Sequence, residues 1–218
     1  MSAYTTVIFD LDGTLLNTLD DLADSVNHAL ALHAMPLRSL EEVRRFVGNG
    51  VGLLVERAVP QGTPADLTAQ VLADFRAHYQ TNMANKTAPY PGVPQVLRTL
   101  KGKGVKLAVV SNKIDGAVKD LCREYFPGLI GVAIGESPSV ARKPAPDTAL
   151  KALEELGASR ERAVYVGDSD VDIQTAHNAA LPCISVTWGF RGEEFLRAHG
   201  ASVTVDTPAE LLALLENP

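Results

Sequence analysis

Short apolar runs that alternate with helix-length segments are the feature that most constrains the fold of this chain. The first run, Val7-Ile8-Phe9, stops abruptly at Asp10, which is typical of a strand buried in a parallel sheet. Similar runs recur at Lys106–Val110, Leu129–Ile134, Ala163–Val166, Cys183–Val186 and Ser202–Val205. Helix-length segments lie between them, at Val93–Lys103, Gly116–Tyr125, Asp147–Leu156, Val171–Ala180 and Pro208–Leu215. This order predicts right-handed βαβ units, and hence an α/β fold with a three-layer, doubly wound (Rossmann-like) parallel sheet.

One stretch, from about Thr18 to Asn85, breaks this alternation because it shows helical periodicity and no strand. Capping patterns or apolar stripes indicate four helices, at Thr18 with Asp21, Ser39 with Glu42, Val51–Ala58 and Thr63-Pro64. Four amphipathic helices with short connections predict a four-helix bundle. We therefore expect an α/β core formed by residues 1–16 and 86–218. A helical cap at 17–85 would be inserted after the first strand and stand over its carboxyl end.

Composition narrows the class of protein. A chain of 218 residues fits one domain, or a core with a smaller inserted domain, at about 150 residues per domain. Its 46% hydrophobic and 21% charged residues exclude a disordered or fibrous protein. A net charge of −6 without a Lys or Arg run argues against nucleic acid and anionic lipid as partners.

The expected location follows from other patterns. The chain shows neither a basic segment followed by an apolar stretch at its start nor an apolar run near 18 residues. Cys122 and Cys183 lie far apart, which suits free thiols in a reducing compartment. We expect a cytoplasmic protein, monomer or homodimer, without a membrane partner.

Polar clusters follow four of the predicted strands or lie in the loops beyond them. They are Asp10-Leu11-Asp12-Gly13-Thr14, Ser111-Asn112-Lys113, Lys143-Pro144-Ala145-Pro146, and Gly167-Asp168-Ser169 with Asp172. Open α/β sheets bind ligands outside the carboxyl ends of their strands, so these clusters are the candidate site.

The acidic residues of these clusters predict a cation site. In an extended chain Asp10 and Asp12 point to the same side, and Asp168 and Asp172 add two more carboxylates. Two carboxylates about 4 Å apart repel by roughly 4 kcal/mol at an effective dielectric constant near 20. Such clustering is unfavourable unless a cation or a proton lies among them. Hard oxygen ligands that are partly open to water suit Mg²⁺.

An acidic metal cluster beside a lysine and a serine outlines a phosphoryl-transfer site. Lys143 would neutralise phosphate charge, and Ser111 would donate a hydrogen bond, although Ser111 could also cap a helix. A carboxylate can attack phosphorus to give an aspartyl-phosphate. Asp10 and Asp12 fit the two roles of nucleophile and acid/base.

The four clusters, in this order, resemble the four motifs of the haloacid dehalogenase superfamily, and the resemblance covers nearly the whole chain. It implies that Asp10 is the nucleophile and Asp12 the general acid/base. It also implies that Asp10, the backbone carbonyl of Asp12, and Asp168 hold Mg²⁺, with Asp172 supporting the metal or Lys143. Asp12 argues against dehalogenase chemistry, because the dehalogenases of the family lack an acid two residues after the nucleophile.

Within the superfamily, Val47–Val51 and Ser111-Asn112-Lys113 resemble the phosphoglycolate phosphatase branch. The resemblance implies a Mg²⁺-dependent phosphatase that acts on a small phosphorylated metabolite, best matched by 2-phosphoglycolate. Expected phosphate or substrate contacts are Thr14, Asn112, Gly48, Asn49 and Gly50. Asn17-Thr18 stands at the hinge where relatives often carry an Asp-Ser pair, which bears on cap motion and on the exact substrate.

Other interpretations remain open at this point. A sugar-phosphate mutase, similar to β-phosphoglucomutase, or a pyrophosphatase would share every core motif. A non-catalytic binding or regulatory protein would be expected to lack at least one catalytic residue, and none is missing here. Gly48 and Gly50 could simply end one helix and begin the next, and Trp188 could border the site or only pack.

Overall fold

The computed structural model describes residues 4–217. The chain forms two compact units. The described parts of the first are residues 4–16 and 89–217, and the second is Asn17–Ala88. The chain passes between the units at β2 (Leu16–Asn17) and β3 (Ala88–Pro89), which form a separate two-stranded sheet.

The first unit is built on a six-stranded sheet of order β5-β4-β1-β6-β7-β8, in which every paired strand is parallel. Its strands are β1 (Thr6–Phe9), β4 (Lys106–Ile114), β5 (Val132–Glu136), β6 (Ala163–Gly167), β7 (Cys183–Val186) and β8 (Thr204–Val205). The strand order reverses at β1, which lies between β4 and β6. This is the topological switch point, where open α/β sheets form a crevice for ligands.

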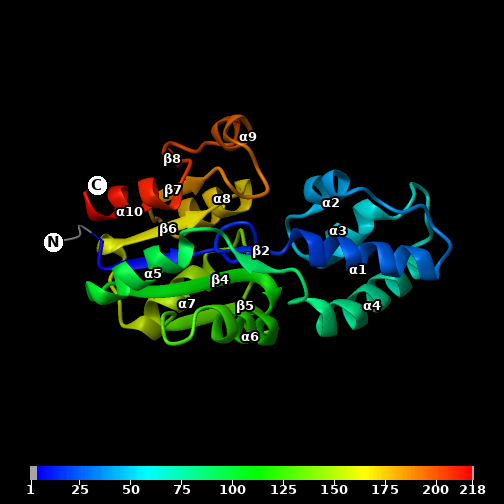
Figure 1. Cartoon of the computed structure of the whole chain (residues 1–218), viewed down its shortest axis with the longest axis horizontal. Helices are drawn as coiled ribbons and strands as arrows, with labels where there is room; N and C mark the ends of the chain where they lie inside the picture. The colour runs from blue at the N-terminus through cyan, green and yellow to red at the C-terminus, as the bar shows by residue number, and fades with distance from the viewer. Residues whose placement is uncertain (1–3, 218) are drawn as a thin grey trace. The chain divides into compact units, whose positions relative to one another are not determined.

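Helices cover both faces of this sheet, as Figure 1 shows. They are α5 (Val93–Gly102), α6 (Asp115–Tyr125), α7 (Asp147–Leu156), α8 (Asp170–Asn178), α9 (Glu193–Ala198) and α10 (Pro208–Glu216), with a short 3₁₀ turn at Arg160–Arg162. Because side chains alternate along β1, Ile8 packs against α7 and α8, while Phe9 faces α5 and α10. The predicted three-layer, doubly wound α/β fold is confirmed.

Several details of this unit differ from the expectation, among them the start of β8, which lies at Thr204 rather than Ser202. Strand β4 runs on to Ile114 through a register shift after Val110, so it carries the second polar cluster itself. Strand β5 begins at Val132 rather than Leu129, because the amide of Leu129 donates to the carbonyl of Phe126 in a turn. Helix α9 was not predicted, since Leu196 is its only buried residue and an apolar stripe is missing from its sequence.

The second unit consists of α1 (Leu19–Leu32), α2 (Leu40–Phe46), α3 (Val51–Ala58) and α4 (Ala65–Asn82). No strand occurs within Thr18–Asn85, all of which the structure describes. Buried side chains such as Val26 on α1 and Phe75 on α4 form its interior. None of the described helices combines the length and the apolar character needed to cross a membrane.

Of the three capping predictions, the one for Ser39 is confirmed, the one for Thr18 holds for the N-cap position but not for the capping box, and the one for Thr63 is wrong. The Ser39 side chain accepts from the amide of Glu42, whose side chain accepts from Ser39 in return, so this capping box exists. Thr18 is the N-cap residue of α1 but its side chain makes no cap hydrogen bond, and the Asp21 carboxylate accepts from the amides of Lys86 and Thr87, so the capping box does not form. The Thr63 hydroxyl donates to the Pro60 carbonyl, and α4 therefore starts at Ala65 with Pro64 as N-cap.

Candidate active site

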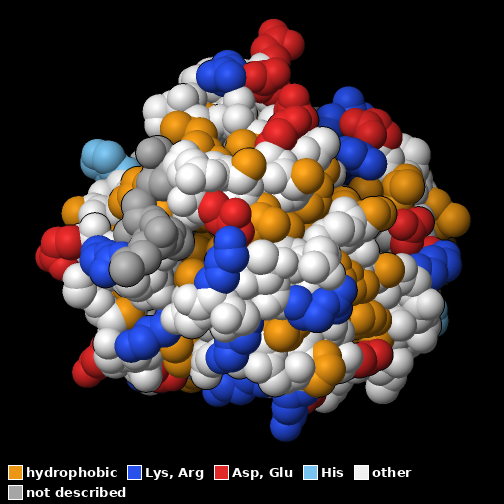
Figure 2. All heavy atoms as spheres, turned by 60° about the vertical axis from the view of Figure 1, so that its left-hand side comes forward, with side chains coloured by type: hydrophobic (Ala, Val, Ile, Leu, Met, Phe, Trp, Pro, Cys, Tyr) orange, Lys and Arg blue, Asp and Glu red, His pale blue; other side chains and the backbone are white. Residues whose placement is uncertain are grey.

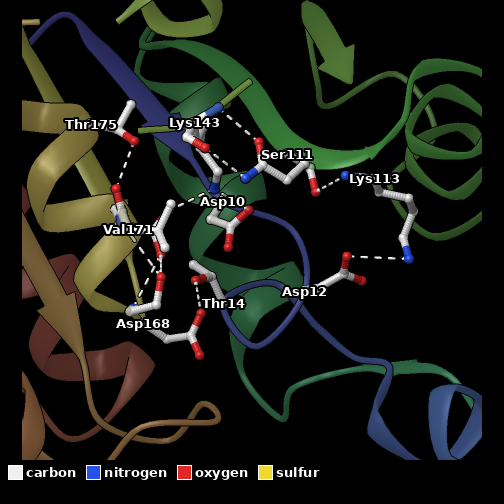
Figure 3. Close-up of polar contacts among 12 residues, drawn as sticks. Asp10, Asp12, Thr14, Ser111, Lys113, Lys143, Asp168, Val171 and Thr175 are labelled. Atoms are coloured by element: carbon white, nitrogen blue, oxygen red, sulfur yellow. Dashed lines mark hydrogen bonds and ion pairs between the residues drawn. The ribbon is translucent and has the colours of Figure 1, made fainter. Parts of the chain in front are cut away.

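The polar clusters of the first unit meet at the carboxyl ends of the central strands, where Figure 3 shows them. Asp10 directly follows β1, and Asp168 directly follows β6. Ser111 lies on β4, on the other side of β1. All three side chains are buried, at 7%, 1% and 3% residual exposure respectively. The sheet topology therefore brings together residues that lie far apart in the sequence.

Lys143 links two of the acidic residues. Its Nζ lies 2.8 Å from Asp10 Oδ1 and 2.7 Å from Asp172 Oδ1. The Tyr165 hydroxyl donates to the same oxygen of Asp172, over 3.1 Å. Burial alone would lower the pKa of Lys143, but the carboxylates of Asp10 and Asp172 outweigh it and raise that pKa well above its ordinary value. Lys143 is thus held as a buried cation beside the predicted nucleophile.

Asn112 positions the loop that carries Lys143. Its side-chain amide donates to the Lys143 carbonyl over 2.9 Å, and its side-chain oxygen accepts from the Lys143 amide over 2.8 Å. The predicted phosphate contact of Asn112 stays a prediction, but the structure assigns this side chain to the lysine loop.

Two donors fix the carboxylate of Asp168. The Thr14 hydroxyl donates to Oδ1 over 3.1 Å, and the Phe190 amide donates to Oδ2 over 2.8 Å. Thr14 is completely buried, so the structure places its hydroxyl against Asp168, where we had expected it to face phosphate. Trp188 belongs to the same network, because its Nε1 donates to the Thr14 carbonyl over 3.0 Å.

Glycine is required where the backbone closes around Asp168. A Cβ on Gly13, whose φ is +87°, would lie 2.3 Å from Asp168 Oδ2. A Cβ on Gly189 would lie 2.4 Å from the same oxygen. Any larger residue at either position would displace the carboxylate.

Three carboxylates form the candidate metal centre. One oxygen each of Asp10, Asp168 and Asp172 lies within 4.8 Å of the others. Burial, followed by repulsion from Asp172, raises the pKa of Asp10 well above its usual range and that of Asp168 to about 7. A cation among these oxygens would relieve both effects, so the site fits a divalent ion with hard oxygen ligands.

Asp172 has a structural function as well. With Ser169 it forms the capping box that starts α8, and it is completely buried. A Cβ on Gly167 would lie 2.3 Å from its side chain. Since Asp172 also binds Lys143, it supports the lysine directly, which is one of the two roles predicted for it.

Asp12 departs from the expected clustering. Its carboxylate does not belong to the trio but forms an ion pair with Lys113, at 3.2 Å between Oδ2 and Nζ. Sequence reasoning assigned no function to Lys113. The signal appears only when β4 is extended to Ile114, because Lys113 then follows Ser111 by two residues in a strand and points to the same side. The predicted metal contact through the Asp12 backbone carbonyl stays a prediction.

The remaining predicted substrate contacts belong to the helical unit. Gly48, Asn49 and Gly50 connect α2 to α3 with three successive positive φ angles, of 126°, 60° and 88°. Asn is one of the few residues other than Gly that tolerate this conformation. Gly50 is also the N-cap of α3, so the connecting role that we left open for this glycine is real. Contact of the three residues with substrate stays a prediction.

Comparison with known proteins supports the same chemistry. The family model described as haloacid dehalogenase-like hydrolase matches residues 7–186. The phosphoglycolate phosphatase of Aquifex aeolicus is 32% identical over 212 residues, which are 97% of this chain and 96% of that protein. The phosphoglycolate phosphatase of Mesorhizobium japonicum is 36% identical over 190 residues, covering 84% of this chain and 83% of its own.

A solved structure agrees closely as well. The crystal structure of a protein from Lactobacillus delbrueckii subsp. bulgaricus, provisionally named a phosphoglycolate phosphatase, has a TM-score of 0.95 at 37% identity. The match covers 100% of both chains. The resemblance expected from the motifs is thereby confirmed, and this chain belongs to the haloacid dehalogenase-like hydrolase family.

Proposed function

We propose that this protein is a Mg²⁺-dependent phosphatase that hydrolyses 2-phosphoglycolate through an aspartyl-phosphate on Asp10. The observation that carries this proposal is the buried trio of Asp10, Asp168 and Asp172 with Lys143 between two of its members. Two relatives that align with most of this chain are named phosphoglycolate phosphatases, which supports the substrate.

The reaction would take place in two steps. In the first, a carboxylate oxygen of Asp10 attacks phosphorus, the ester P–O bond breaks, and Asp12 gives a proton to the departing alkoxide. In the second, Asp12 takes a proton from a water molecule that attacks the aspartyl-phosphate. The P–O bond to Asp10 then breaks, and Asp10 is regenerated with release of inorganic phosphate.

Other residues would hold the phosphoryl group and the cation. Lys143 supplies a positive charge next to Asp10, and the Ser111 hydroxyl lies on the neighbouring strand as a donor. Asp10, Asp168 and the Asp12 carbonyl would bind Mg²⁺, which neutralises charge on the phosphoryl oxygens when bound. Asp172 would keep Lys143 in place.

We further propose that unit Asn17–Ala88 acts as a cap that closes over the site and selects the leaving group. Its connecting loop with Asn49 would contact the substrate.

We propose a cytoplasmic location and a monomeric or homodimeric state as well. Figure 2 shows acidic, basic and uncharged side chains interspersed over one face of the molecule.

The test is a panel of phosphate compounds, each assayed with Mg²⁺ and with EDTA. The measured quantity is the release of inorganic phosphate. The panel contains 2-phosphoglycolate, glucose 1-phosphate and pyrophosphate. We expect Mg²⁺-dependent release that is fastest from 2-phosphoglycolate. Conversion of glucose 1-phosphate to glucose 6-phosphate would instead identify a mutase, and faster release from pyrophosphate would identify a pyrophosphatase.

A further inference from the structure

Each of the two aspartates after β1 has its own lysine. Lys143 contacts Asp10, and Lys113 contacts Asp12 (Figure 3). The Lys113 side chain is only 5% exposed, so its charge is almost completely removed from water. Lys143 neutralises part of the carboxylate trio, whereas Lys113 contacts an aspartate that is not a member of it.

Strand β4 defines where Lys113 lies. Its amide donates to Ser111 Oγ over 3.2 Å, and its side chain is on the same side of the strand as that of Ser111. Two residues of extended chain carry it roughly 7 Å farther along β4, towards the carboxyl end of the strand, than Ser111. If Ser111 binds the phosphoryl group, Lys113 lies beyond it, on the side where the leaving alcohol must be.

The two oxygens of Asp12 have different surroundings. Oδ2 faces Lys113 at 3.2 Å, whereas Oδ1 is buried and lacks a hydrogen-bond partner among the described residues. An acid that protonates the leaving oxygen must approach it within about 3 Å. With Oδ1 against the leaving oxygen, Lys113 is separated from that oxygen by little more than the width of one carboxylate group.

We propose that Lys113 binds a carboxylate of the leaving group and so selects esters of 2-hydroxy acids. The carboxylate would be attached to the carbon that bears the ester oxygen, as in 2-phosphoglycolate. This inference rests on the proposed function, since it needs Asp12 at the leaving group. It adds the residue in the core that distinguishes a carboxylate-bearing substrate from a neutral one.

A cation is needed here for a physical reason. A neutral donor would suffice to orient Asp12, as Asn112 orients the lysine loop through neutral hydrogen bonds. A buried ammonium group is costly to desolvate and is favoured where anions compensate for it. Asp12 supplies one negative charge, and the substrate carboxylate supplies a second on the same side.

The test compares two esters of equal chain length, 2-phosphoglycolate and ethyl phosphate, with wild type and Lys113→Met. We expect the wild type to prefer 2-phosphoglycolate in kcat/KM. In Lys113→Met, kcat/KM for 2-phosphoglycolate should fall at least about tenfold more than for ethyl phosphate, as expected for loss of a hydrogen bond between charged groups. Lys119→Met, which removes an exposed lysine of α6 paired with Asp115, is the charge-matched control and should leave this ratio unchanged.

Binding and rescue provide independent readouts. Titration calorimetry in an Asp10→Asn background should show weaker binding of 2-phosphoglycolate, and not of ethyl phosphate, when Lys113→Met is added. Lys113→Arg, which keeps the charge, should keep the preference for the carboxylate. Both experiments use the full chain, and circular dichroism checks that each variant is folded. If Lys113→Met does not fold, the inference is still tested by the preference of the wild type for 2-phosphoglycolate over ethyl phosphate and by whether Lys113→Arg keeps that preference.

The outcomes separate the inference about Lys113 from the proposed phosphatase function. If Lys113→Met lowers kcat for both esters equally, Lys113 only positions Asp12 and the inference is wrong. A wild type that hydrolyses ethyl phosphate as well as 2-phosphoglycolate also overturns it, while the phosphatase assignment survives. A wild type that hydrolyses no ester in the panel contradicts the proposed function instead.

Discussion

Two aspartates, one in each unit, are equally buried and differ in what surrounds them. Asp21 of the helical unit and Asp168 of the α/β unit both retain 1% exposure. Asp21 accepts the backbone amides of Lys86 and Thr87, at 2.8 to 3.0 Å. Asp168 has one amide and one hydroxyl donor but also lies in a cluster of carboxylates.

This difference separates a structural charge from a functional one. The charge of Asp21 is compensated within the protein, because its carboxylate accepts hydrogen bonds from two backbone amides. These amides belong to Lys86 and Thr87, the two residues directly before β3. The charge of Asp168 is not fully compensated within the protein. Burial and the charge of Asp172 disfavour the ionised form and raise the pKa of Asp168 to about 7. Burial of a charge therefore does not identify a site by itself. A buried charge that its own surroundings disfavour does.

The largest expected effect is that of Asp10→Asn on catalysis. The substitution keeps the shape of the side chain but removes the attacking carboxylate, so the covalent route is closed. We expect kcat to fall by about three orders of magnitude or more, with a circular dichroism spectrum like that of the wild type. Retained turnover would mean direct attack by water and a different role for Asp10.

For Asp168→Asn we expect lost activity together with gained stability in EDTA. Removing one charge of a like-charged buried cluster should raise the free energy of unfolding by about 1–4 kcal/mol at pH 8. An asparagine can still accept the Phe190 amide and donate to the Thr14 hydroxyl. The measurement is urea denaturation, and a destabilised variant would contradict the functional reading of the cluster.

The pH dependence of that gain has a defined sign. The folded-state pKa of Asp168, about 7, lies above the ordinary value of 3.8. The native state therefore keeps a proton that the unfolded state releases, and metal-free wild type loses stability as pH rises between these values. The advantage of Asp168→Asn should grow over the same range and nearly vanish near pH 4.

Asp21→Asn should have the opposite effect to Asp168→Asn. We expect it to lower the free energy of unfolding, with little change in kcat per folded molecule. In either orientation the new NH₂ group would face the Lys86 amide, and in one of them also the Thr87 amide, so a buried site meant for an acceptor would hold a second donor, at a cost of about 1–3 kcal/mol. Asp24→Asn is the matched control, because Asp24 contacts the Lys86 side chain in an exposed ion pair, which contributes little to stability. Equal destabilisation by both variants would show that the buried acceptor has no special importance.

The smallest effect concerns Asn49. Asn49→Gly removes the side chain but tolerates the φ of 60°, so backbone strain does not confuse the result. We expect a change in KM or in substrate ranking of about three- to tenfold, with the same Mg²⁺ requirement. An unchanged ester panel would show that the loop between α2 and α3 only connects the two helices.

The parts of the fold that were predictable are those set by local patterns. Buried strands such as Thr6–Phe9 and helices such as Asp147–Leu156 follow from apolar runs and helical periodicity. The Ser39 cap depends on residues three apart and was found. Asp21 could not be interpreted in the same way, since its partners lie 65 and 66 residues away and outcompete the local cap.

The candidate site was predictable for its members and not for their pairing. The strand-end positions of Asp10, Ser111 and Asp168 follow from the βα pattern. The sequence could not show that Thr14 faces Asp168, because that bond depends on how the loop after β1 packs on β6. The pairing of Asp12 with Lys113 was missed because β4 was expected to end at Val110.

The most direct test of the central claim is release of inorganic phosphate from 2-phosphoglycolate by the wild type, before and after chelation. Asp10, Asp12, Asp168 and Asp172 outnumber Lys113 and Lys143 in the site, so a phosphate dianion needs a further cation there. We predict that EDTA abolishes release and that added Mg²⁺ restores it. Full activity after exhaustive chelation, with no metal detected in the protein, would contradict the account.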